Sequence, residues 1–479
     1  MRAYLASSIG VACAAALVLP LALPASAAPT VSRTPALTAP AGESAVPGST
    51  QSLPLRSLPS ERATGAARQG LARSDVRPFS LVGIVWDDPE AELNGSVQVR
   101  TRAIGTGAWS GWQSVETHNH AHAADPGTPE RDSGTVRGST APLWVGASDG
   151  VEVRVRAEAP RSGTGPAALP RGMRIELVDP GDEPGTEPAG EVDPATDPVV
   201  DPAGEDTAQG PEVPEGTDTG TTSGQVPAPA LTAEESAASA VNAELAPLGA
   251  TEIPELTKEQ TDAELAEQFG EEAAAAKPYV GPRPRIVTRK GWGADEKLRE
   301  RDFVYTKSVQ AAFVHHSATG NNYTCKQAPS VLRSIYRYHV KSSGWRDIGY
   351  NFAVDKCGNI YEGRAGGVAK AVLGAHTLGF NTNSMGIAVL GTYSQSTPPS
   401  AAVTAVARLT AWKLGLYGKD PRAKTTLTSG GGNRYKKGTK VKLNVISGHR
   451  DGFVTDCPGT QLYNKLGTAR SASAKYQGR

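Results

Sequence analysis

The apolar residues follow different periods in the two halves of the chain. Between residues 76 and 179, short runs such as 95–102 and 151–156 alternate apolar with polar residues, and turns rich in Gly and Pro separate them. A period of two is typical of strands with one buried face. Several such strands within about 100 residues predict an all-β, sandwich-like accessory domain over residues 76–179.

After residue 283 the pattern changes to alternating strands and helices. The apolar run 311–314 predicts a strand that ends at His315, and residues 328–340 and 402–416 repeat apolar side chains at helical spacing. This alternation predicts an α/β domain over residues 283–479.

The remaining segments lack such periods. Residues 1–27 combine a basic start, an apolar run and an A-x-A cleavage site, which predicts a signal peptide and a secreted protein, either extracellular or associated with the cell wall. Residues 28–75 are rich in Ser, Pro, Ala and Thr and are expected to be disordered. Residues 180–282 predict an acidic, Pro-rich linker, within which Thr232 and Thr257 can begin short helices.

The net charge of zero conceals a separation of charge along the chain. Residues 179–282 hold roughly 24 acidic and 2 basic side chains, whereas residues 283–479 hold roughly 31 Lys and Arg against 10 Asp and Glu. A basic exported domain favours an anionic wall polymer as a partner over nucleic acid. A general solubility charge is the alternative. After the signal segment, no stretch approaches the ~20 apolar residues of a membrane span.

The cysteine count indicates a metal. Once Cys13 leaves with the signal peptide, Cys325, Cys357 and Cys457 remain, which is an odd number in an oxidising compartment. One thiol should therefore have a use other than pairing.

Histidines offer the partners that such a thiol needs. A catalytic zinc takes three N or S ligands and keeps one position open. His315, His449 and Cys457 supply such a set. The alternating residues His118, His120 and His122 would share one face of a strand and could then bind a metal, but their polar surroundings favour a loop.

Six ordered motifs make residues 284–470 resemble the family of peptidoglycan recognition proteins and phage-lysozyme-type zinc N-acetylmuramoyl-L-alanine amidases. The motifs are RKGWGA at 289–294, VHHSAT at 314–319, WRDIGYNF at 345–352, YEGR at 361–364, GAHT with GFN at 374–381, and GHRD with DCPG at 448–459. The resemblance implies a mixed central sheet flanked by helices. It also implies hydrolysis of the amide between N-acetylmuramic acid and L-alanine in bacterial peptidoglycan.

The resemblance carries roles to individual residues. It implies a Zn²⁺ ion held by His315, His449 and Cys457, and a water or oxyanion contact from Tyr350. Phage members place a lysine two residues before the cysteine, where this chain has Thr455, as animal members often do. Thr455 is therefore a second catalytic candidate, and the identity of the proton-transfer partner stays open.

Other positions match the family's peptide groove. Arg364, His376 and Asn381 are candidates for contacts with the stem peptide, although each could equally serve the structure. With Cys457 assigned to the metal, Cys325 and Cys357 are expected to form a disulfide.

Two other classes of function remain open. Some family members have lost the metal-binding cysteine and only bind wall fragments, although the presence of His315, His449, Cys457 and Tyr350 together argues against this. A thiol hydrolase would instead use Cys457 as nucleophile and His449 as base, and it would not need a metal.

Overall fold

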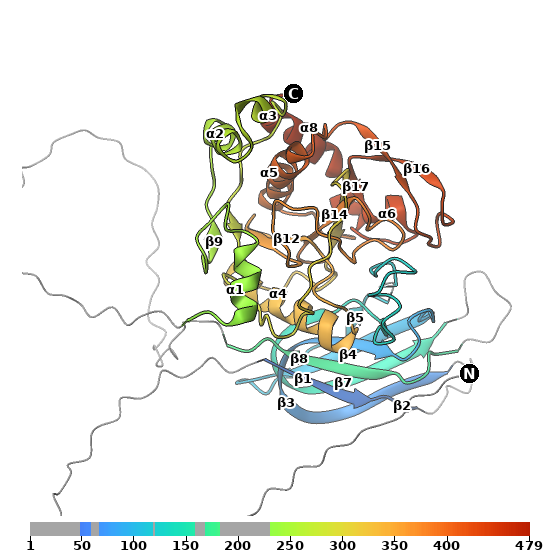
Figure 1. Cartoon of the computed structure of the whole chain (residues 1–479). Coiled ribbons are helices and arrows are strands. Elements are labelled where there is room, and N and C mark those ends of the chain that lie inside the picture. Colours follow the sequence, from blue (N-terminus) through green and yellow to red (C-terminus); the bar gives the residue numbers. More distant parts are fainter. Residues whose placement is uncertain (1–47, 59–66, 118–119, 159–167, 183–229) are drawn as a thin grey trace, which may run out of the picture. The chain divides into compact units, whose positions relative to one another are not determined.

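The computed structural model describes residues 48–58, 67–117, 120–158, 168–182 and 230–479. The predicted signal peptide and residues 183–229 of the predicted linker lie outside these ranges. All described residues belong to one compact unit, Ala45–Arg479, in which an all-β N-terminal domain contacts an α/β C-terminal domain (Figure 1). Within the described ranges, no helix is long and apolar enough to cross a membrane.

Eight strands form the sheet of the N-terminal domain. They are β1 (Ser49–Pro54), β2 (Arg56–Ser57), β3 (Arg68–Trp86), β4 (Gly95–Ala103), β5 (Gln113–Val115), β6 (Gly138–Ser139), β7 (Leu143–Ala157) and β8 (Arg174–Asp179). The main strand order is β1-β8-β3-β7-β4-β5, and β2 and β6 pair with β3. Every pairing is antiparallel.

The predicted alternation is present in β7. Val151, Val153 and Val155 are buried in the domain core, whereas Arg154 and Arg156 are exposed. The all-β prediction is therefore confirmed, but the prediction of disorder over residues 28–75 is wrong for residues 48–58 and 67–75, because β1, β2 and the start of β3 lie there. These strands are polar and only partly buried, so they lack the apolar alternation that marks a strand.

The C-terminal domain is built on a second, seven-stranded sheet. Its strands are β9 (Glu252–Ile253), β10 (Ile286–Val287), β11 (Ala311–His316), β12 (Phe352–Val354), β13 (Ile360–Glu362), β14 (Ser384–Val389) and β17 (Ile446–Gly448), in the order β17-β11-β14-β12-β13-β10-β9. The pairs that include β11 or β14 are parallel, whereas β12 with β13 and β9 with β10 are antiparallel. The predicted mixed sheet is confirmed.

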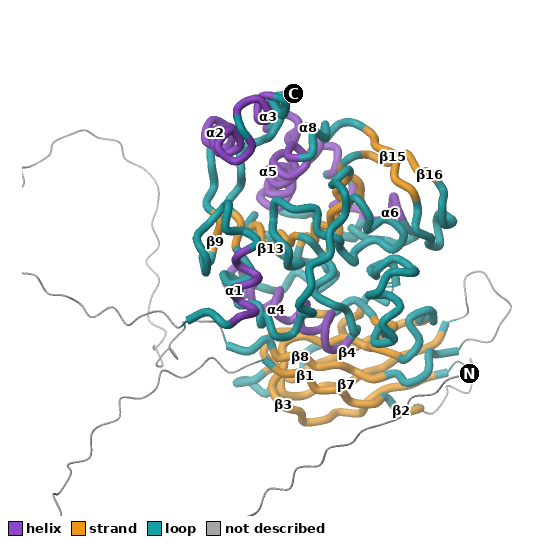
Figure 2. The backbone as a smooth tube through the Cα atoms, in the orientation of Figure 1, coloured by secondary structure: helices purple, strands orange, loops and turns teal. Residues whose placement is uncertain are grey.

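Helices cover both faces of this sheet (Figures 1 and 2). Helices α5 (Ser400–Leu416) and α8 (Leu466–Tyr476) lie side by side and share one apolar core with the sheet. Helix α4 (Ala328–Arg337), extended by η2 (Tyr338–Ser342), shares the other core. That second core also contains Leu81, Val85 and Trp144 of the N-terminal domain. Helix α4 is thus packed between the two domains. Shorter helices are η1 (Cys325–Gln327), α6 (His449–Gly452) and α7 (Thr460–Tyr463).

Residues 230–282 are not a linker, which corrects the predicted domain boundary. They form α1 (Ala233–Ala240), β9, α2 (Lys258–Phe269) and α3 (Glu271–Ala275). Thr232 and Thr257 cap α1 and α2, as their sequence suggested. Ile253, Leu265 and Val280 are buried in the core of the C-terminal domain. The segment is acidic overall, but these few apolar residues are enough to anchor it.

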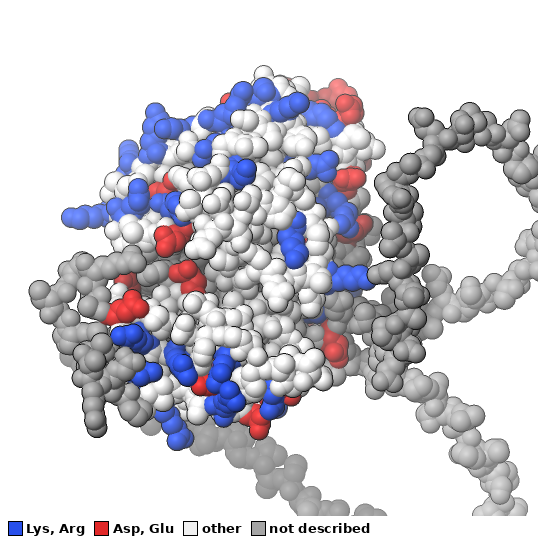
Figure 3. All heavy atoms as spheres, turned by 180° about the vertical axis from the view of Figure 1, so that it is seen from behind, with Lys and Arg blue, Asp and Glu red and all other residues white. Residues whose placement is uncertain are grey.

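Basic side chains concentrate on a separate hairpin of the C-terminal domain. Strands β15 (Lys424–Thr428) and β16 (Lys440–Asn444) pair only with each other. Residues 424–442, which we call the lysine hairpin, contain no acidic residue and expose the cations Lys424, Arg434, Lys436, Lys437, Lys440 and Lys442. Figure 3, the view from behind relative to Figure 1, shows more Lys and Arg than Asp and Glu on the upper part of the molecule.

Candidate metal centre and groove

The topology of the sheet brings two predicted ligands together. Strands β11 and β17 are parallel neighbours, so His315 near the end of β11 and His449 directly after β17 reach the same edge of the sheet. Their ring centroids lie 4.5 Å apart. The loop after α6 then returns Cys457, whose Sγ lies 3.7 Å from Nδ1 of His315. The three predicted metal ligands are therefore adjacent and buried.

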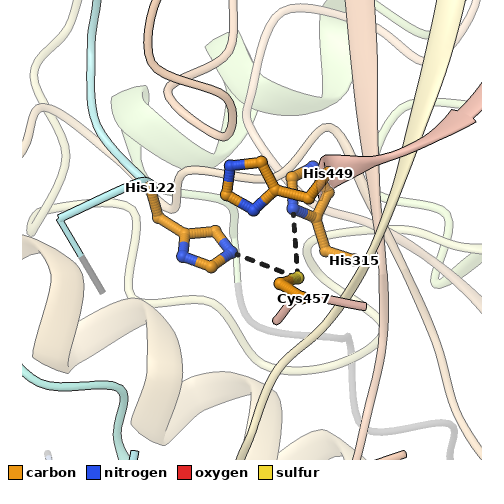
Figure 4. Close-up of side chains that lie close together, drawn as sticks. All are labelled: His122, His315, His449 and Cys457. Atoms are coloured by element: carbon orange, nitrogen blue, oxygen red, sulfur yellow. Dashed lines mark hydrogen bonds between the residues drawn. The ribbon is translucent and has the colours of Figure 1, made fainter. Parts of the chain in front are cut away.

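A fourth residue, His122 of the N-terminal domain, completes this cluster (Figure 4). Its Nε2 lies 3.7 Å from Sγ of Cys457, although 335 residues separate the two in the chain. One potential ligand atom from each of the four residues lies within 4.8 Å of those of the others. The sequence prediction that residues 118–122 form a loop rather than a strand is confirmed for the described residues, but the loop carries His122 into the candidate metal centre. The alternation of histidines at 118–122 is the only local signal, and it does not indicate that the loop reaches Cys457.

The distances from Cys457 to two of the histidines fit a zinc ion. A tetrahedral zinc with bonds of about 2.0–2.3 Å keeps its ligand atoms roughly 3.3–3.8 Å apart, and both contacts of Cys457 Sγ with the histidines measure 3.7 Å. Nδ1 of His449 is buried without a hydrogen-bond partner among the described residues. Unpaired buried nitrogens are costly, and a metal would satisfy such atoms.

Electrostatics also favour a metal over a charged histidine cluster. Burial lowers the pKa of His122 to about 3 and the pKa values of His315 and His449 well below the ordinary value, so all three imidazoles are neutral, as metal ligands must be. Burial raises the pKa of the Cys457 thiol. A thiolate at this position therefore needs a stabilising cation.

Neighbouring groups hold the histidine rings in place. Thr377 Oγ1 lies 3.4 Å from Nε2 of His315, and the carbonyl oxygen of Ala121 lies 3.1 Å from Nε2 of His449. In both rings this leaves Nδ1 for the metal, since hydrogen bonding to the other nitrogen selects the tautomer and the orientation of a ligand.

The two predicted catalytic residues lie beside the cluster. The ring of Tyr350 is buried, 5.5 Å from His315 and 5.8 Å from His122 by ring centroids. Burial raises the pKa of Tyr350, so its hydroxyl keeps its proton. Thr455 is half-buried, and its Oγ1 accepts a hydrogen bond of 3.2 Å from the backbone N–H of Cys457. In this conformation Thr455 supports the loop that presents Cys457.

The three predicted groove residues have different surroundings. The guanidinium of Arg364 forms a bidentate ion pair with Glu130, with both N–O distances 2.8 Å. The side-chain amide of Asn381 donates to Asp125 Oδ1 and to the carbonyl oxygen of Ala123. His376 is fully buried beneath the cluster, with Nδ1 3.0 Å from Thr377 Oγ1. Residues of the N-terminal domain thus cover Arg364 and Asn381, whereas His376 lies in the interior.

Other positions behave as the sequence suggests. Cys325 and Cys357 form a disulfide, the predicted pairing. His316 is buried and its Nδ1 accepts from the backbone N–H of Tyr393. His120 is half-buried near Phe453, with ring centroids 6.1 Å apart, and His118 lies outside the described residues.

The fold and the site together define an α/β domain with a candidate metal centre at the edge of its sheet. Two families match the chain. Residues 305–460 match the family described as N-acetylmuramoyl-L-alanine amidase, and residues 35–198 match the family described as Rv3811 N-terminal galactose-binding domain-like.

Individual proteins are similar to part of the chain. Peptidoglycan-recognition protein SC2 of Drosophila simulans is 34% identical over 185 residues, which cover 38% of this chain and 85% of that protein. N-acetylmuramoyl-L-alanine amidase of Homo sapiens is 32% identical over 189 residues, which cover 39% of this chain and 28% of that protein. A structure of peptidoglycan recognition protein-LE in complex with tracheal cytotoxin is 28% identical, covers 38% of this chain and 92% of its own, and has a TM-score of 0.30. The chain belongs to the family of peptidoglycan recognition proteins and N-acetylmuramoyl-L-alanine amidases.

Proposed function

We propose that the protein is an exported, zinc-dependent N-acetylmuramoyl-L-alanine amidase. Its family supports peptidoglycan binding or amidase activity. The observation that favours the enzyme is the buried set of His315, His449 and Cys457 next to Tyr350. A module that only binds wall fragments has no use for this set of metal ligands.

The chemistry follows from the residues around the metal. Bound Zn²⁺ would polarise the scissile carbonyl and activate a water molecule as nucleophile. Tyr350 keeps its proton and can donate a hydrogen bond to the oxyanion that develops on that carbonyl. Thr377 holds the His315 ring in position. The hydroxyl of Thr455 accepts from the backbone N–H of Cys457, and its own O–H makes it the second candidate donor.

The raised pKa of Cys457 argues against a thiol hydrolase. A nucleophilic cysteine needs a lowered pKa and a charged or polar neighbourhood. Burial instead raises the pKa of the Cys457 thiol. A thiolate that is bound to zinc removes this difficulty, because the ion provides the compensating charge.

We further propose that the protein works outside the cell on peptidoglycan and contacts anionic wall polymers. The predicted signal peptide supports export. The lysine hairpin supplies a basic surface, and its turn borders the candidate site, since Asn433 and Val454 are hydrogen-bonded to each other. Such a surface would raise the local concentration of an anionic polymer near the metal.

Mass spectrometry of digested peptidoglycan tests the activity. The zinc-loaded full chain should, on prolonged incubation with purified muropeptides, release free stem peptides that begin with L-alanine. The Cys457→Ser variant should bind zinc poorly and release none, because a serine hydroxyl stays protonated and is a poor zinc ligand. Ser471→Ala, an exposed change on α8, is the matched control. Unaltered hydrolysis by Cys457→Ser after chelation would contradict both the zinc and the thiol mechanisms.

A further inference from the structure

We propose that residues 120–137 of the N-terminal domain, the covering loop, hold this site closed by supplying a fourth metal ligand and occupying the peptide groove. The loop connects β5 to β6 and lies between the N-terminal sheet and the C-terminal domain (Figure 1). This inference rests on the proposed function of the same site. It assigns to the accessory domain a regulatory role in addition to any binding role.

The first observation is the ligand count. Catalytic zinc sites use three protein ligands and leave one position for water or substrate, whereas four protein ligands are the mark of a closed site. His122 lies as close to Cys457 Sγ as His315 does, at 3.7 Å. Its ring also lies 4.4 Å from that of His449. With His122 bound, the position that a catalytic water requires is taken.

The second observation is that two carboxylates of the loop pair with the predicted groove residues. Glu130 is buried and pairs in a bidentate manner with Arg364. Asp125, also buried, accepts 2.7 Å hydrogen bonds from the side chain of Asn381 and from the backbone N–H of Gly379. Bidentate Arg–carboxylate pairs and backbone N–H groups are common means of recognising the carboxylates of a peptide. The loop therefore occupies groups that a stem peptide would use.

The third observation concerns space. The cavity next to the cluster is lined by His122, Thr455 and Cys457, among others, and has a volume of about 10 Å³. This is about the space of one water molecule. An amide flanked by a sugar and a peptide cannot enter while the loop is in place.

The loop is built so that it can be displaced. Its apolar contacts near the site are made by small side chains, Ala121 and Ala123, which pack with Leu378 and Phe453. Alanine methyl groups bury little apolar surface. At the groove the loop is attached through the carboxylates of Asp125 and Glu130, and a ligand with its own carboxylates can replace these two contacts. Residues 132–135 at the far end of the loop are exposed, so the loop is not enclosed on all sides.

Variants of the full chain test the two attachments separately. His122→Ala removes the fourth ligand, while Asp125→Asn and Glu130→Gln together weaken the groove contacts and leave all four ligands in place. Asp132→Ala, an exposed change in the same loop, is the matched control. Far-UV circular dichroism and thermal melting establish that each variant is folded, and the conservative Asp125→Asn alone serves if the double variant is not.

Two readouts do not depend on activity. The rate of zinc transfer to a chromogenic chelator should rise about tenfold or more in His122→Ala, since the ion loses a ligand and gains access to solvent. Affinity for a soluble muramyl peptide, measured by calorimetry, should rise about tenfold or more in Asp125→Asn/Glu130→Gln, because the closed fraction no longer reduces the apparent affinity. Hydrolysis should increase in both variants. Asp132→Ala should match the wild type in every measurement.

The outcomes separate this inference from the proposed function. If zinc transfer and peptide affinity increase in the variants but no form hydrolyses muropeptides, the covering loop blocks metal access and peptide binding, and the chain is not an amidase. If all forms hydrolyse muropeptides equally, with unchanged zinc transfer and peptide affinity, the chain is an amidase and the inference about the loop is wrong. Unchanged zinc transfer in His122→Ala, by itself, would remove His122 from the metal.

Discussion

The ion pair between Glu130 and Arg364 should contribute about 3 kcal/mol to the free energy that holds the covering loop against the C-terminal domain. Glu130→Ala removes the carboxylate and leaves the guanidinium of Arg364 buried, where it keeps a 2.8 Å hydrogen bond from Nε to the carbonyl oxygen of Ile348. Both side chains are less than a tenth exposed, so solvent screening does not weaken the pair much. Breaking one partner of a buried pair costs roughly 3–5 kcal/mol, and the remaining hydrogen bond favours the lower end, about 3 kcal/mol. Because ~1.4 kcal/mol corresponds to a factor of ten, the population of the open loop should rise roughly 150-fold.

Hydrogen exchange followed by mass spectrometry can measure this change. The backbone N–H groups of Leu378 and Gly379 donate to Ala121 O and Asp125 Oδ1 of the loop, so they report its opening from the other domain. Their exchange should accelerate in Glu130→Ala, while the amides of α5 and β11 in the core should change little. The control is Glu300→Ala, which removes the exposed carboxylate of an ion pair to Arg346 and should have an effect of about 1 kcal/mol. Equal acceleration at Leu378, in α5 and in β11 would show that the pair stabilises the whole domain and not the loop.

Three other predictions concern the catalytic residue, the disulfide and the basic surface. In the opened His122→Ala background, Tyr350→Phe should retain zinc and lose about 10²-fold in turnover, the usual effect of removing one oxyanion donor, and an unchanged rate would exclude Tyr350 from the mechanism. Replacing Cys325 and Cys357 by Ser should lower the free energy of unfolding by about 3–4 kcal/mol, since the bridge spans 32 residues. In thermal melting, reductant should destabilise the wild type to the same extent and should not change the melting of the variant. Replacing Lys436 and Lys437 by Gln should reduce binding to anionic wall polymer at low salt, and a loss that persists at high salt would contradict an electrostatic role.

The sequence predicted the parts of the site that depend on local order. His315 lies near the end of a buried apolar strand, and His449 and Cys457 lie in a short motif, so their proximity follows from parallel strands that end at one edge of a sheet. The all-β and α/β character of the two domains also follows from periods of apolar residues, as in Val151, Val153 and Val155.

The parts that could not be predicted depend on contacts between distant segments. His122 lies in a polar loop, and contacts between the two domains, such as those of Asp125 and Glu130 with the C-terminal domain, bring that loop to the metal ligands. The strands before residue 68 are polar and partly exposed, and residues 230–282 are acidic with few apolar anchors. The composition of these segments indicates correctly that they are polar. It does not indicate that a few buried side chains such as Ile253 anchor residues 230–282 to the core.

The covering loop and the lysine hairpin together would restrict opening of the site to places where wall polymer is abundant. Because the loop belongs to the same chain, a competing peptide faces an effective concentration of the loop of about millimolar or more. Dilute soluble fragments would seldom displace it, whereas an intact wall presents many peptides at a high local concentration. The lysine hairpin borders the same groove, since the backbone N–H of Gly430 donates to the carbonyl oxygen of Gly379, and Gly379 in turn donates to Asp125 of the loop. Binding of the hairpin to an anionic wall would therefore hold stem peptides next to the contacts that they must replace, so that the site opens where the polymer is dense.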